Sequence, residues 1–219
     1  MLEKEAELLG MHAGDGTLYK TNSNTIVWEM RGSIYEQDYY SYVSKLLLDL
    51  FDIEVTPKYR GPNSYGIQTC KKPIIKFFLD NGFKPGSKVY TVSIPRCIKE
   101  DSVKIKREFI RGLFDTDGCV IFEKNRTPFH YYPRIEFGFA SKSLSRDLFD
   151  LFIELNFRPH QWKNVRKDGI DFRVALAGFK NLDKWINEIG SSNLKHINRM
   201  KEGLLNKSKI KLKKPSANL

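Results

Sequence analysis

The chain contains two copies of one short motif, and this repeat constrains the fold more than any other feature. Residues 8–16 (LLGMHAGDG) are matched by residues 110–118 (IRGLFDTDG), and Asp117 follows Asp15 by 102 residues in a chain of 219. Each copy resembles an apolar helix that contains glycine, ends in Asp-Gly and leads into a strand. A repeat of this length indicates two copies of one structural unit.

The likeness between the halves continues beyond the motif and predicts an α+β fold. Each motif precedes two short strands joined as a hairpin, an amphipathic helix, a second hairpin and a last helix that ends at glycine, as helix C-termini often do. The expected strands are 17–22 and 25–31 in the first half and 119–124 and 133–139 in the second. The expected helices after them are 39–50, 72–81, 144–155 and 180–189, and the second hairpins turn at 60–64 and 167–169. We therefore expect units at 1–98 and 99–206, followed by a basic tail at 207–219.

The charge of the chain limits its partners. It carries 37 basic and 26 acidic residues, a net charge of +11, which favours a nucleic acid or an anionic membrane surface. No apolar run approaches the roughly 20 residues that span a bilayer, and the acidic start does not resemble a signal peptide. The three cysteines form no CxxC pair and the four histidines show no zinc spacing, so we expect reduced thiols and an intracellular, cytoplasmic protein, beside the nucleoid in a prokaryote.

The two motif acids point to a metal. Small residues one turn apart, Gly10 with Gly14 and Gly112 with Thr116, let two helices approach closely about a pseudo-two-fold axis. Two aspartates would then lie side by side at helix C-termini, where the helix dipole disfavours acids. An acid at this unfavourable place in both copies indicates a function. Mg²⁺ suits the place, because it accepts one or two carboxylates while keeping water and phosphate ligands. The simpler explanation, that each Asp-Gly is only a turn, suits one copy better than two.

Two other Asp-x-Asp sites fit less well. A calcium loop of the EF-hand type needs further acids and a terminal glutamate, which do not follow residues 115–118. The phosphatase motif follows a buried strand, whereas residues 106–111 form an amphipathic pattern of helical period.

At these residues the chain resembles the LAGLIDADG homing endonucleases, in the form with two motifs in one chain. The resemblance covers roughly residues 1–206 and implies two pseudo-symmetric αββαββα units whose antiparallel sheets form a saddle over DNA, with the motif helices packed at the central interface. It also implies cleavage of both strands across the minor groove with Mg²⁺, or Mn²⁺ in its place, leaving short 3′ overhangs. The implied metal ligands are Asp15, Asp117 and the carbonyl groups of Gly14 and Thr116.

Some positions depart from the family pattern or extend it. Ala13 replaces an acid usual in the family, and His12 is an interface or surface residue rather than a general base. Lys88 and Lys195 follow the third helix of each half at similar distances from their acids. The resemblance implies catalytic lysines there, which would stabilise charge on the phosphorane; the alternative is a lysine that faces a helix dipole. Lys142 matches a further polar position near the site.

Polar residues on the expected strands are candidates for contact with DNA. Alternation places Ile135 and Phe137 towards the helices and their neighbours on the opposite face. Each candidate could equally belong to a solvated strand face, but together they explain the net charge better and would make binding salt-dependent. The candidates are Thr17, Tyr19, Glu29, Arg31, Lys58, Arg60, Arg134, Glu136, Lys163 and Arg166. The basic tail is either a frayed terminus or an arm that contacts phosphates.

These observations favour a metal-dependent, sequence-specific endonuclease that acts as a monomer on a long double-stranded DNA target, pseudo-palindromic or asymmetric. The alternative is a non-cutting protein of the same fold, an RNA-splicing maturase that binds intron RNA or a DNA-binding regulator. A small-molecule phosphatase is a remote third candidate, because no Gly-rich phosphate loop is present. Met1 in place of a Cys or Ser nucleophile, and the absence of a final His-Asn, favour a protein outside an intein.

Overall fold

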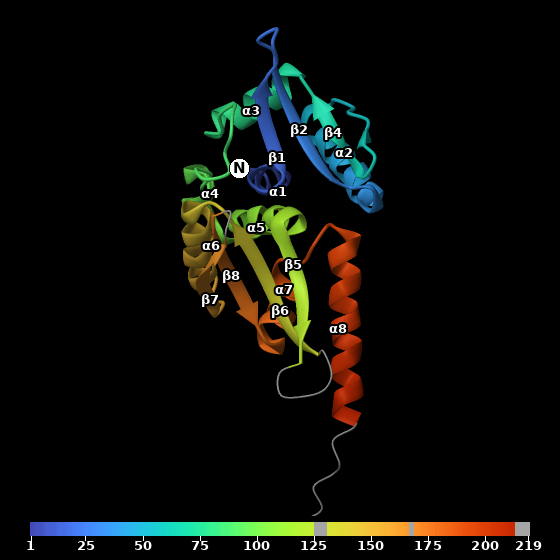
Figure 1. Cartoon of the computed structure of the whole chain (residues 1–219), viewed down its shortest axis with the longest axis vertical. Coiled ribbons are helices and arrows are strands. Elements are labelled where there is room, and N and C mark those ends of the chain that lie inside the picture. The colour runs from blue at the N-terminus through green and yellow to red at the C-terminus, as the bar shows by residue number, and fades with distance from the viewer. Residues whose placement is uncertain (125–130, 167–168, 213–219) are drawn as a thin grey trace, which may run out of the picture.

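Two halves with the same order of elements lie one above the other in the computed structural model (Figure 1). The structure describes residues 1–124, 131–166 and 169–212. The first half contains α1 (Glu3–Ala13), β1 (Gly16–Lys20), β2 (Ile26–Ser33), the short 3₁₀ helix η1 (Ile34–Glu36), α2 (Gln37–Phe51), β3 (Lys58–Gly61), β4 (Ser64–Thr69) and α3 (Lys72–Asp80). The second contains α4 (Arg96–Lys99), α5 (Val103–Asp117), β5 (Gly118–Glu123), β6 (Tyr132–Phe139), α6 (Lys142–Glu154), β7 (Pro159–Arg166), β8 (Gly169–Ala177), α7 (Phe179–Glu188) and α8 (Leu194–Leu212). The predicted α+β class and the repeated αββαββα order are confirmed.

Helix α8 is the main element that the sequence pattern did not predict. Its backbone continues through Leu212 and so includes the first residues of the expected basic tail. It packs beside β5, where Met200 is buried and the guanidinium of Arg199 lies 5.1 Å from the centre of the Phe122 ring. Residues 213–219, and the side chains from 206 onward, lie outside the described residues, so the proposed phosphate-contacting arm stays a prediction.

Each half builds a four-stranded antiparallel sheet in the same way. The strand orders are β1-β2-β4-β3 and β5-β6-β8-β7. The register is equivalent too, because Gly16 pairs with Met30 in the first sheet and Gly118 pairs with Phe137 in the second. Position 30 therefore corresponds to position 137, and the residues before and after them correspond in turn.

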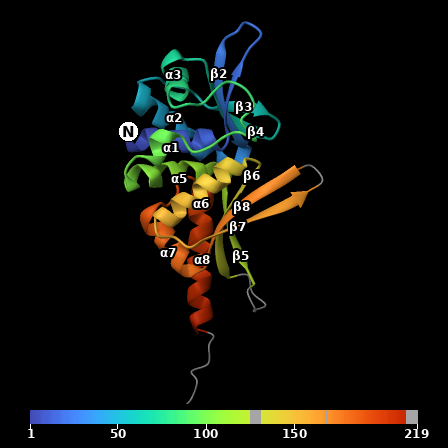
Figure 2. The same cartoon turned by 90° about the vertical axis from the view of Figure 1, so that its left-hand side faces the viewer.

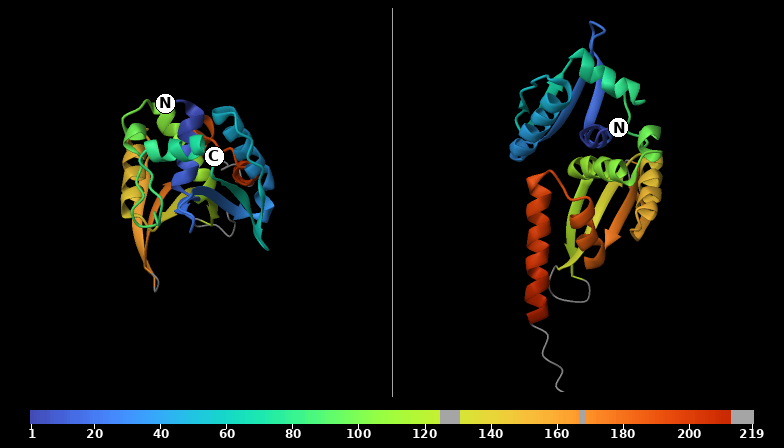
Figure 3. Two further views of the ribbon diagram at one scale, coloured as in Figure 1. Left: turned by 90° about the horizontal axis from the view of Figure 1, so that it is seen from above. Right: turned by 180° about the vertical axis from the view of Figure 1, so that it is seen from behind.

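The helices cover one face of each sheet and leave the other face open. Figure 2 shows the helices on one side of the molecule and the strands of both sheets on the other. Alternate strand residues such as Trp28, Met30, Ile135 and Phe137 are buried in the core beneath the helices, as alternation in a half-covered sheet predicts. The view from above in Figure 3 shows the strands of both halves along one side. We call this uncovered side of the two sheets the open face.

Capping residues mark the start of two helices in the second half, and the two middle helices end alike. The Ser102 and Ser141 hydroxyl groups accept hydrogen bonds from the amides of Ile105 and Leu144 and so begin α5 and α6. Asp52 and Asn156, with φ of 54° and 59°, follow the ends of the two middle helices. Left-handed residues there stop each helix before the chain enters the second hairpin.

The halves meet through α1 and α5, which lie side by side at the centre of the molecule (Figures 1 and 2). A Cβ atom on Gly10 would lie 2.0 Å from the Phe109 carbonyl oxygen, and one on Gly112 would lie 2.0 Å from the Glu7 carbonyl oxygen. The helix backbones therefore touch at both glycines, and the expected close approach of the motif helices is observed.

Candidate metal centre and nucleic-acid interface

The two motif aspartates lie where α1 and α5 end side by side. A Cβ atom on Gly14 would lie 2.0 Å from the Thr116 hydroxyl oxygen and 3.3 Å from Cγ of Asp117. The Thr116 hydroxyl instead donates to the carbonyl oxygens of Leu113 and Gly112, at 3.0 and 3.3 Å. Because the helix ends touch here, Asp15 and Asp117 are brought to one end of the interface.

Both carboxyl groups are strained electrostatically in the absence of a counter-ion. Partial desolvation raises the pKa of Asp15 to about 6, and the neighbouring Glu36 adds to the shift, although the residue is exposed at the rim of the interface. Desolvation and the charge of Asp15 raise the pKa of Asp117 to about 7. Lys88 opposes the shift in both groups. Two acids that repel each other in a partly desolvated place are suited to a bound cation.

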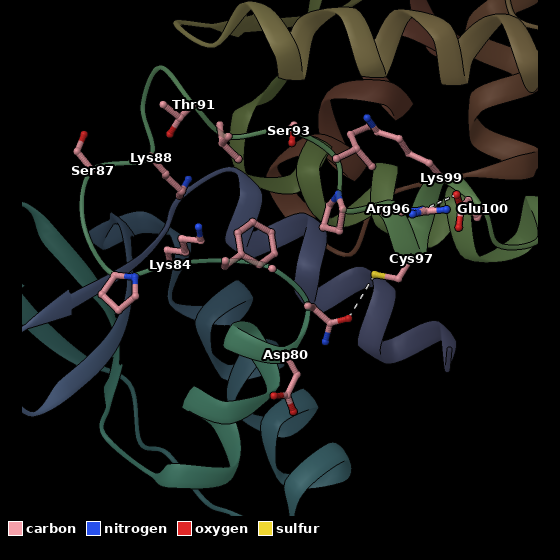
Figure 4. A pocket seen from close by; sticks show the side chains of 17 residues that line it. Asp80, Lys84, Ser87, Lys88, Thr91, Ser93, Arg96, Cys97, Lys99 and Glu100 are labelled. Atoms are coloured by element: carbon pink, nitrogen blue, oxygen red, sulfur yellow. Dashed lines mark hydrogen bonds and ion pairs between the residues drawn. The ribbon is translucent and has the colours of Figure 1, made fainter.

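Lys88 reaches this centre from the loop that joins the halves. Its ammonium group donates to the carbonyl oxygens of Ala13 and Gly14, at 2.7 and 2.5 Å, and so covers the end of α1. Desolvation lowers the pKa of Lys88, while the charges of Asp117 and Asp15 oppose that shift. Figure 4 shows Lys88 and Lys84 on this loop, which lines a pocket that continues to Arg96 and Lys99 of α4.

The corresponding lysine of the second half is placed differently. Lys195 is 65% exposed, and its ammonium nitrogen lies 3.6 Å from Oε1 of Glu36 in the first half. The buried Asn193 amide donates to the same Glu36 oxygen at 3.0 Å and to the Asp115 carbonyl oxygen at 3.2 Å. Glu36 was not among the predicted site residues, because only the folded chain brings it to Asp15 and Lys195.

Lys142 and His12 take positions that limit their roles. Lys142 is the exposed first residue of α6, and within the described part of the chain it makes no hydrogen bond or ion pair with either aspartate. His12 is 1% exposed, and its Nδ1 accepts a hydrogen bond of 3.1 Å from the Trp28 indole. Burial, with a smaller effect of Lys88, lowers the pKa of His12 well below its usual value. His12 is therefore a neutral core residue of the first half, which excludes the surface position considered for it.

The donor set fits a hard divalent cation. Two carboxylates and nearby backbone carbonyls, including that of Gly14, supply the oxygen ligands that Mg²⁺ prefers. In the part of the chain that the structure describes, no cluster of three or more His, Cys, Asp or Glu side chains could hold a metal. A cation at the helix ends would therefore take only two side-chain ligands from the protein and leave positions for water and phosphate.

A buried polar network ties the halves together behind the aspartates. The Glu7 carboxylate, 1% exposed, accepts hydrogen bonds from Arg111 at 3.0 Å, Tyr42 at 2.8 Å and Ser192 at 2.6 Å. Asp115, also buried, accepts from the Ser191 hydroxyl at 2.5 Å and the Ser192 amide at 2.8 Å. Burial raises the pKa of Asp115 to about 7, although these hydrogen bonds oppose the shift. Asp115, whose counterpart in the first motif is Ala13, thus anchors the loop before α8.

The open face of the first sheet carries several of the predicted residues. Thr17 pairs with Glu29, and Glu29 pairs with Gln68, so all three point to this face. Gln68 links Arg60, whose guanidinium donates to it at 2.8 Å, with the Tyr19 hydroxyl at 2.5 Å. Register also places Lys58 and Arg31 there, opposite Gly66. Gln68 was missed because no sequence pattern indicates the register of β4.

The open face of the second sheet carries a different set of residues. Arg134 and Glu136 lie on it as expected, and Arg173, which was not predicted, joins them opposite Gly138. Lys163 instead pairs with Phe172, which pairs with the core residue Phe139. Lys163 thus lies on the helix-facing side of the sheet, near the hairpin end, and its contact with DNA stays a prediction. Arg166 pairs with Gly169 at the hairpin end, and its side chain lies outside the described residues.

None of the helices that the structure describes is long and apolar enough to cross a bilayer. The three cysteines carry no disulfide, and Cys119 pairs with Glu136 on the open face.

Comparisons with known proteins agree with this architecture. Residues 104–190 match the family model of the LAGLIDADG-like domain. A solved structure of I-DmoI in complex with DNA and Mn has a TM-score of 0.61 and 19% identity, over 87% of this chain and 98% of that one. The I-LtrWI LAGLIDADG homing endonuclease bound to target DNA has a TM-score of 0.62 and 11% identity, over 96% and 91%. The resemblance found in the motifs is confirmed.

Among curated proteins, the matches are parts of much longer chains. The replicative DNA helicase DnaB of Rhodothermus marinus is 25% identical over 203 residues, which are 87% of this chain and 20% of the helicase. The tRNA-splicing ligase RtcB of Methanopyrus kandleri is 26% identical over 114 residues, 50% of this chain and 12% of the ligase. The chain spans a fifth or less of the length of these relatives.

Proposed function

We propose that this chain, whose second half is a LAGLIDADG-like domain and whose whole fold is that of the LAGLIDADG homing endonucleases, is a sequence-specific, metal-dependent DNA endonuclease. The observation that carries the proposal is the meeting of Asp15 and Asp117 at the ends of the paired helices, between two open sheet faces. Binding alone does not require two mutually repelling acids at that place.

The residues of the chain would divide the work of phosphodiester hydrolysis. Asp15 and Asp117, with the Gly14 and Thr116 carbonyls, would hold Mg²⁺, or Mn²⁺ in its place. A divalent ion bound there supplies Lewis-acid activation of water and of the scissile phosphate. Lys88 already lies at the end of α1 and would stabilise negative charge on the phosphate as it is attacked. Lys195 would have the same role in the second half once it leaves Glu36.

The open face would hold double-stranded DNA. Its arginines, lysines and amides can contact phosphates and base edges, and the net charge of +11 supports binding to a polyanion. Solved relatives of this fold are bound to target DNA, in structures with Mn and with calcium. We infer one active monomer that cuts one strand with each half, leaves 3′ overhangs and works inside the cell, where its DNA is.

Cleavage of a plasmid library with a randomised insert tests this proposal. Linear product from a narrow set of sequences is expected with Mg²⁺, and none with EDTA, Asp15→Asn or Asp117→Asn. Asp80→Asn, at an exposed acid on α3, is the matched control and should cut normally. Normal double-strand cutting by Asp15→Asn or Asp117→Asn would refute the site.

The same variants separate the alternative of a maturase or regulator. Both asparagine variants should keep most of the wild-type DNA affinity, because each loses only one carboxylate. No cutting by wild type under any condition, with retained binding to RNA or DNA, would favour the non-cutting alternative.

A further inference from the structure

Each sheet carries a pair of one glutamate and one arginine on its open face. The glutamates occupy equivalent positions, whereas the arginines come from different strands. Since Met30 corresponds to Phe137, Glu29 corresponds to Glu136 on the central strands β2 and β6. Two residues further along, β2 has Arg31 opposite Gly66 of β4. The same position of β6 has Gly138 opposite Arg173 of β8. Each sheet thus has an arginine opposite a glycine at this position. The arginine is on the central strand β2 in the first sheet and on the neighbouring strand β8 in the second.

Each arginine is held by the equivalent glutamate. Arg31 Nε lies 2.6 Å from Glu29 Oε1 and its Nη2 lies 2.8 Å from Oε2. Arg173 Nη1 lies 2.9 Å from Glu136 Oε1, and Asp171 accepts from Nε of the same guanidinium at 2.7 Å. The other Glu136 oxygen pairs with Arg134, whose Nε lies 2.7 Å away. Glu29 and Glu136 are only 7% and 5% exposed, although both point to the open face. The guanidinium groups therefore cover the carboxylates that orient them.

The glycine makes room for this arrangement in the second sheet. A Cβ atom on Gly138 would lie 2.8 Å from Cζ of Arg173, so the guanidinium rests directly over the glycine. It reaches from β8 to the central strand β6, where the first sheet carries Arg31 itself. The two guanidinium groups thus occupy equivalent places beside the central strand of their sheets, although the arginines belong to different strands.

The pairs lie next to the metal centre along the sheets. Gly16 pairs with Met30 and Gly118 with Phe137, so positions 31 and 138 come level with Asp15 and Asp117. Any DNA seated on the open face with its scissile phosphates at the aspartates would present its neighbouring bases to Arg31 and Arg173. Exposed ion pairs stabilise proteins little, so two buried carboxylates retained at this position need another explanation.

We propose that Arg31 and Arg173 are specificity-determining residues that each select a guanine, one in each half of the target, next to the cleavage sites. The inference rests on the proposed function. An oriented guanidinium matches the O6 and N7 acceptors of guanine in the major groove. Because the two halves are related by a pseudo-two-fold axis, the selected guanines lie on opposite strands. Carboxylates offset the charge of each arginine, Glu29 that of Arg31, and Asp171 with Glu136 that of Arg173, so each arginine contributes more to base selection than to general affinity for phosphate.

Selection of bound duplexes from a randomised library tests this inference without cleavage. Ca²⁺ replaces Mg²⁺, as in the calcium structure of the relative I-SmaMI with uncleaved target. Wild type is compared with Arg31→Ala, Arg31→Lys and Arg173→Ala. Lys58→Ala is the control, since Lys58 is an exposed cation at the edge of the same face.

The expected result is a guanine preference in each half of the wild-type site. Arg31→Ala and Arg31→Lys lose about 5- to 150-fold preference in one half only, and Arg173→Ala loses it in the other half only. The preference kept in the untouched half shows that each variant is folded. Lys58→Ala keeps both preferences, binds all sequences more weakly and lowers the salt dependence by about one charge.

Two outcomes would overturn the inference and are distinguishable. Enrichment of the same bases by the arginine variants as by wild type, or a uniform loss of affinity in both halves, would refute the role of the arginines while leaving DNA binding intact. Failure of wild type to enrich any duplex would refute the proposed function, and the inference with it.

Discussion

Replacing Gly10 with alanine should destabilise the protein, although alanine is the better helix former. Helix propensity alone predicts a gain of about 1 kcal/mol for Gly→Ala within α1. The new Cβ would lie 2.0 Å from the Phe109 carbonyl oxygen, 2.8 Å from the Leu113 amide nitrogen and 2.9 Å from the Phe109 carbonyl carbon. All three are backbone atoms of α5, so no side chain can rotate away.

The magnitude follows from how far the helices must move. Ordinary contact needs about 3.5 Å, so α1 and α5 would have to separate by about 1 Å or more along the central interface. Overpacking of a close-packed interface costs about 1–3 kcal/mol, and occasionally more. Because the contacts are with backbone atoms, we take the cost at or above the upper end of this range, about 3–4 kcal/mol. Less the helix-propensity gain of about 1 kcal/mol, the free energy of unfolding should fall by about 2–3 kcal/mol, which lowers Tm by roughly 4–12 °C for a chain of this size.

Urea and thermal unfolding of Gly10→Ala measure this effect directly. Gly112→Ala should behave alike, because its Cβ would meet the Glu7 carbonyl oxygen at the same distance of 2.0 Å. Gly61→Ala is the control: its nearest neighbour is Ser64 Cβ at 4.0 Å, and its stability should stay within about 0.5 kcal/mol of wild type. A Gly10→Ala protein at least as stable as wild type would show that the helices do not touch as described.

Three other outcomes follow from the site. The pKa of Asp117 is about 7 in the folded chain and near 3.8 when unfolded, so the metal-free protein binds an extra proton between these values and loses stability as pH rises from about 4 to 7. Asp117→Asn should therefore be more stable than wild type above pH 7 without Mg²⁺ and equal to it near pH 4 by thermal unfolding, and added Mg²⁺ should stabilise wild type alone. Glu7→Ala removes the acceptor shared by Arg111, Tyr42 and Ser192, while Arg111 keeps its ion pair with Glu108, and should cost about 1–3 kcal/mol in urea unfolding; an unchanged stability would contradict the network. Lys88→Met should slow plasmid linearisation and accumulate nicked circles more than Lys195→Met does, because only Lys88 is already seated at the helix end; equal effects on a gel time course would argue against this asymmetry.

The repeat made most of the fold predictable. Two motifs with the same spacing of strands and helices define both units, and the small residues of the motifs predict the central helix contact that Gly10 and Gly112 make. Helix α8 was missed because residues 194–212 have only a weak apolar stripe, and because the first half has no counterpart to it.

The open face was predictable only in part, because a strand assigned without its register is ambiguous by one residue. Arg134 and Glu136 were placed correctly from the apolar alternation of β6, whose core residues are plain in the sequence. β7 has no such alternation, so the face of Lys163 could not be assigned and Arg173 of its partner strand was missed. The contacts of Glu36 and Glu7 join residues more than 100 positions apart, and no local pattern could have shown them.

The helix interface also favours the pairing of the two different halves over the pairing of two identical halves. In the repeat, Glu7 corresponds to Phe109 and Arg111 corresponds to Leu9, so the charges that meet across the interface come from positions that are apolar in the other copy. Two copies of the first half would bury Glu7 against a leucine, and two copies of the second would bury Arg111 against a phenylalanine. Self-pairing of the first half leaves Glu7 with no cation across the interface, and self-pairing of the second half leaves Arg111 only Glu108 of its own helix, whereas the mixed pair joins Glu7 to Arg111. A duplicated ancestor that once paired with itself would lose that ability after these changes, and the two halves would then be free to evolve towards different sequences of DNA.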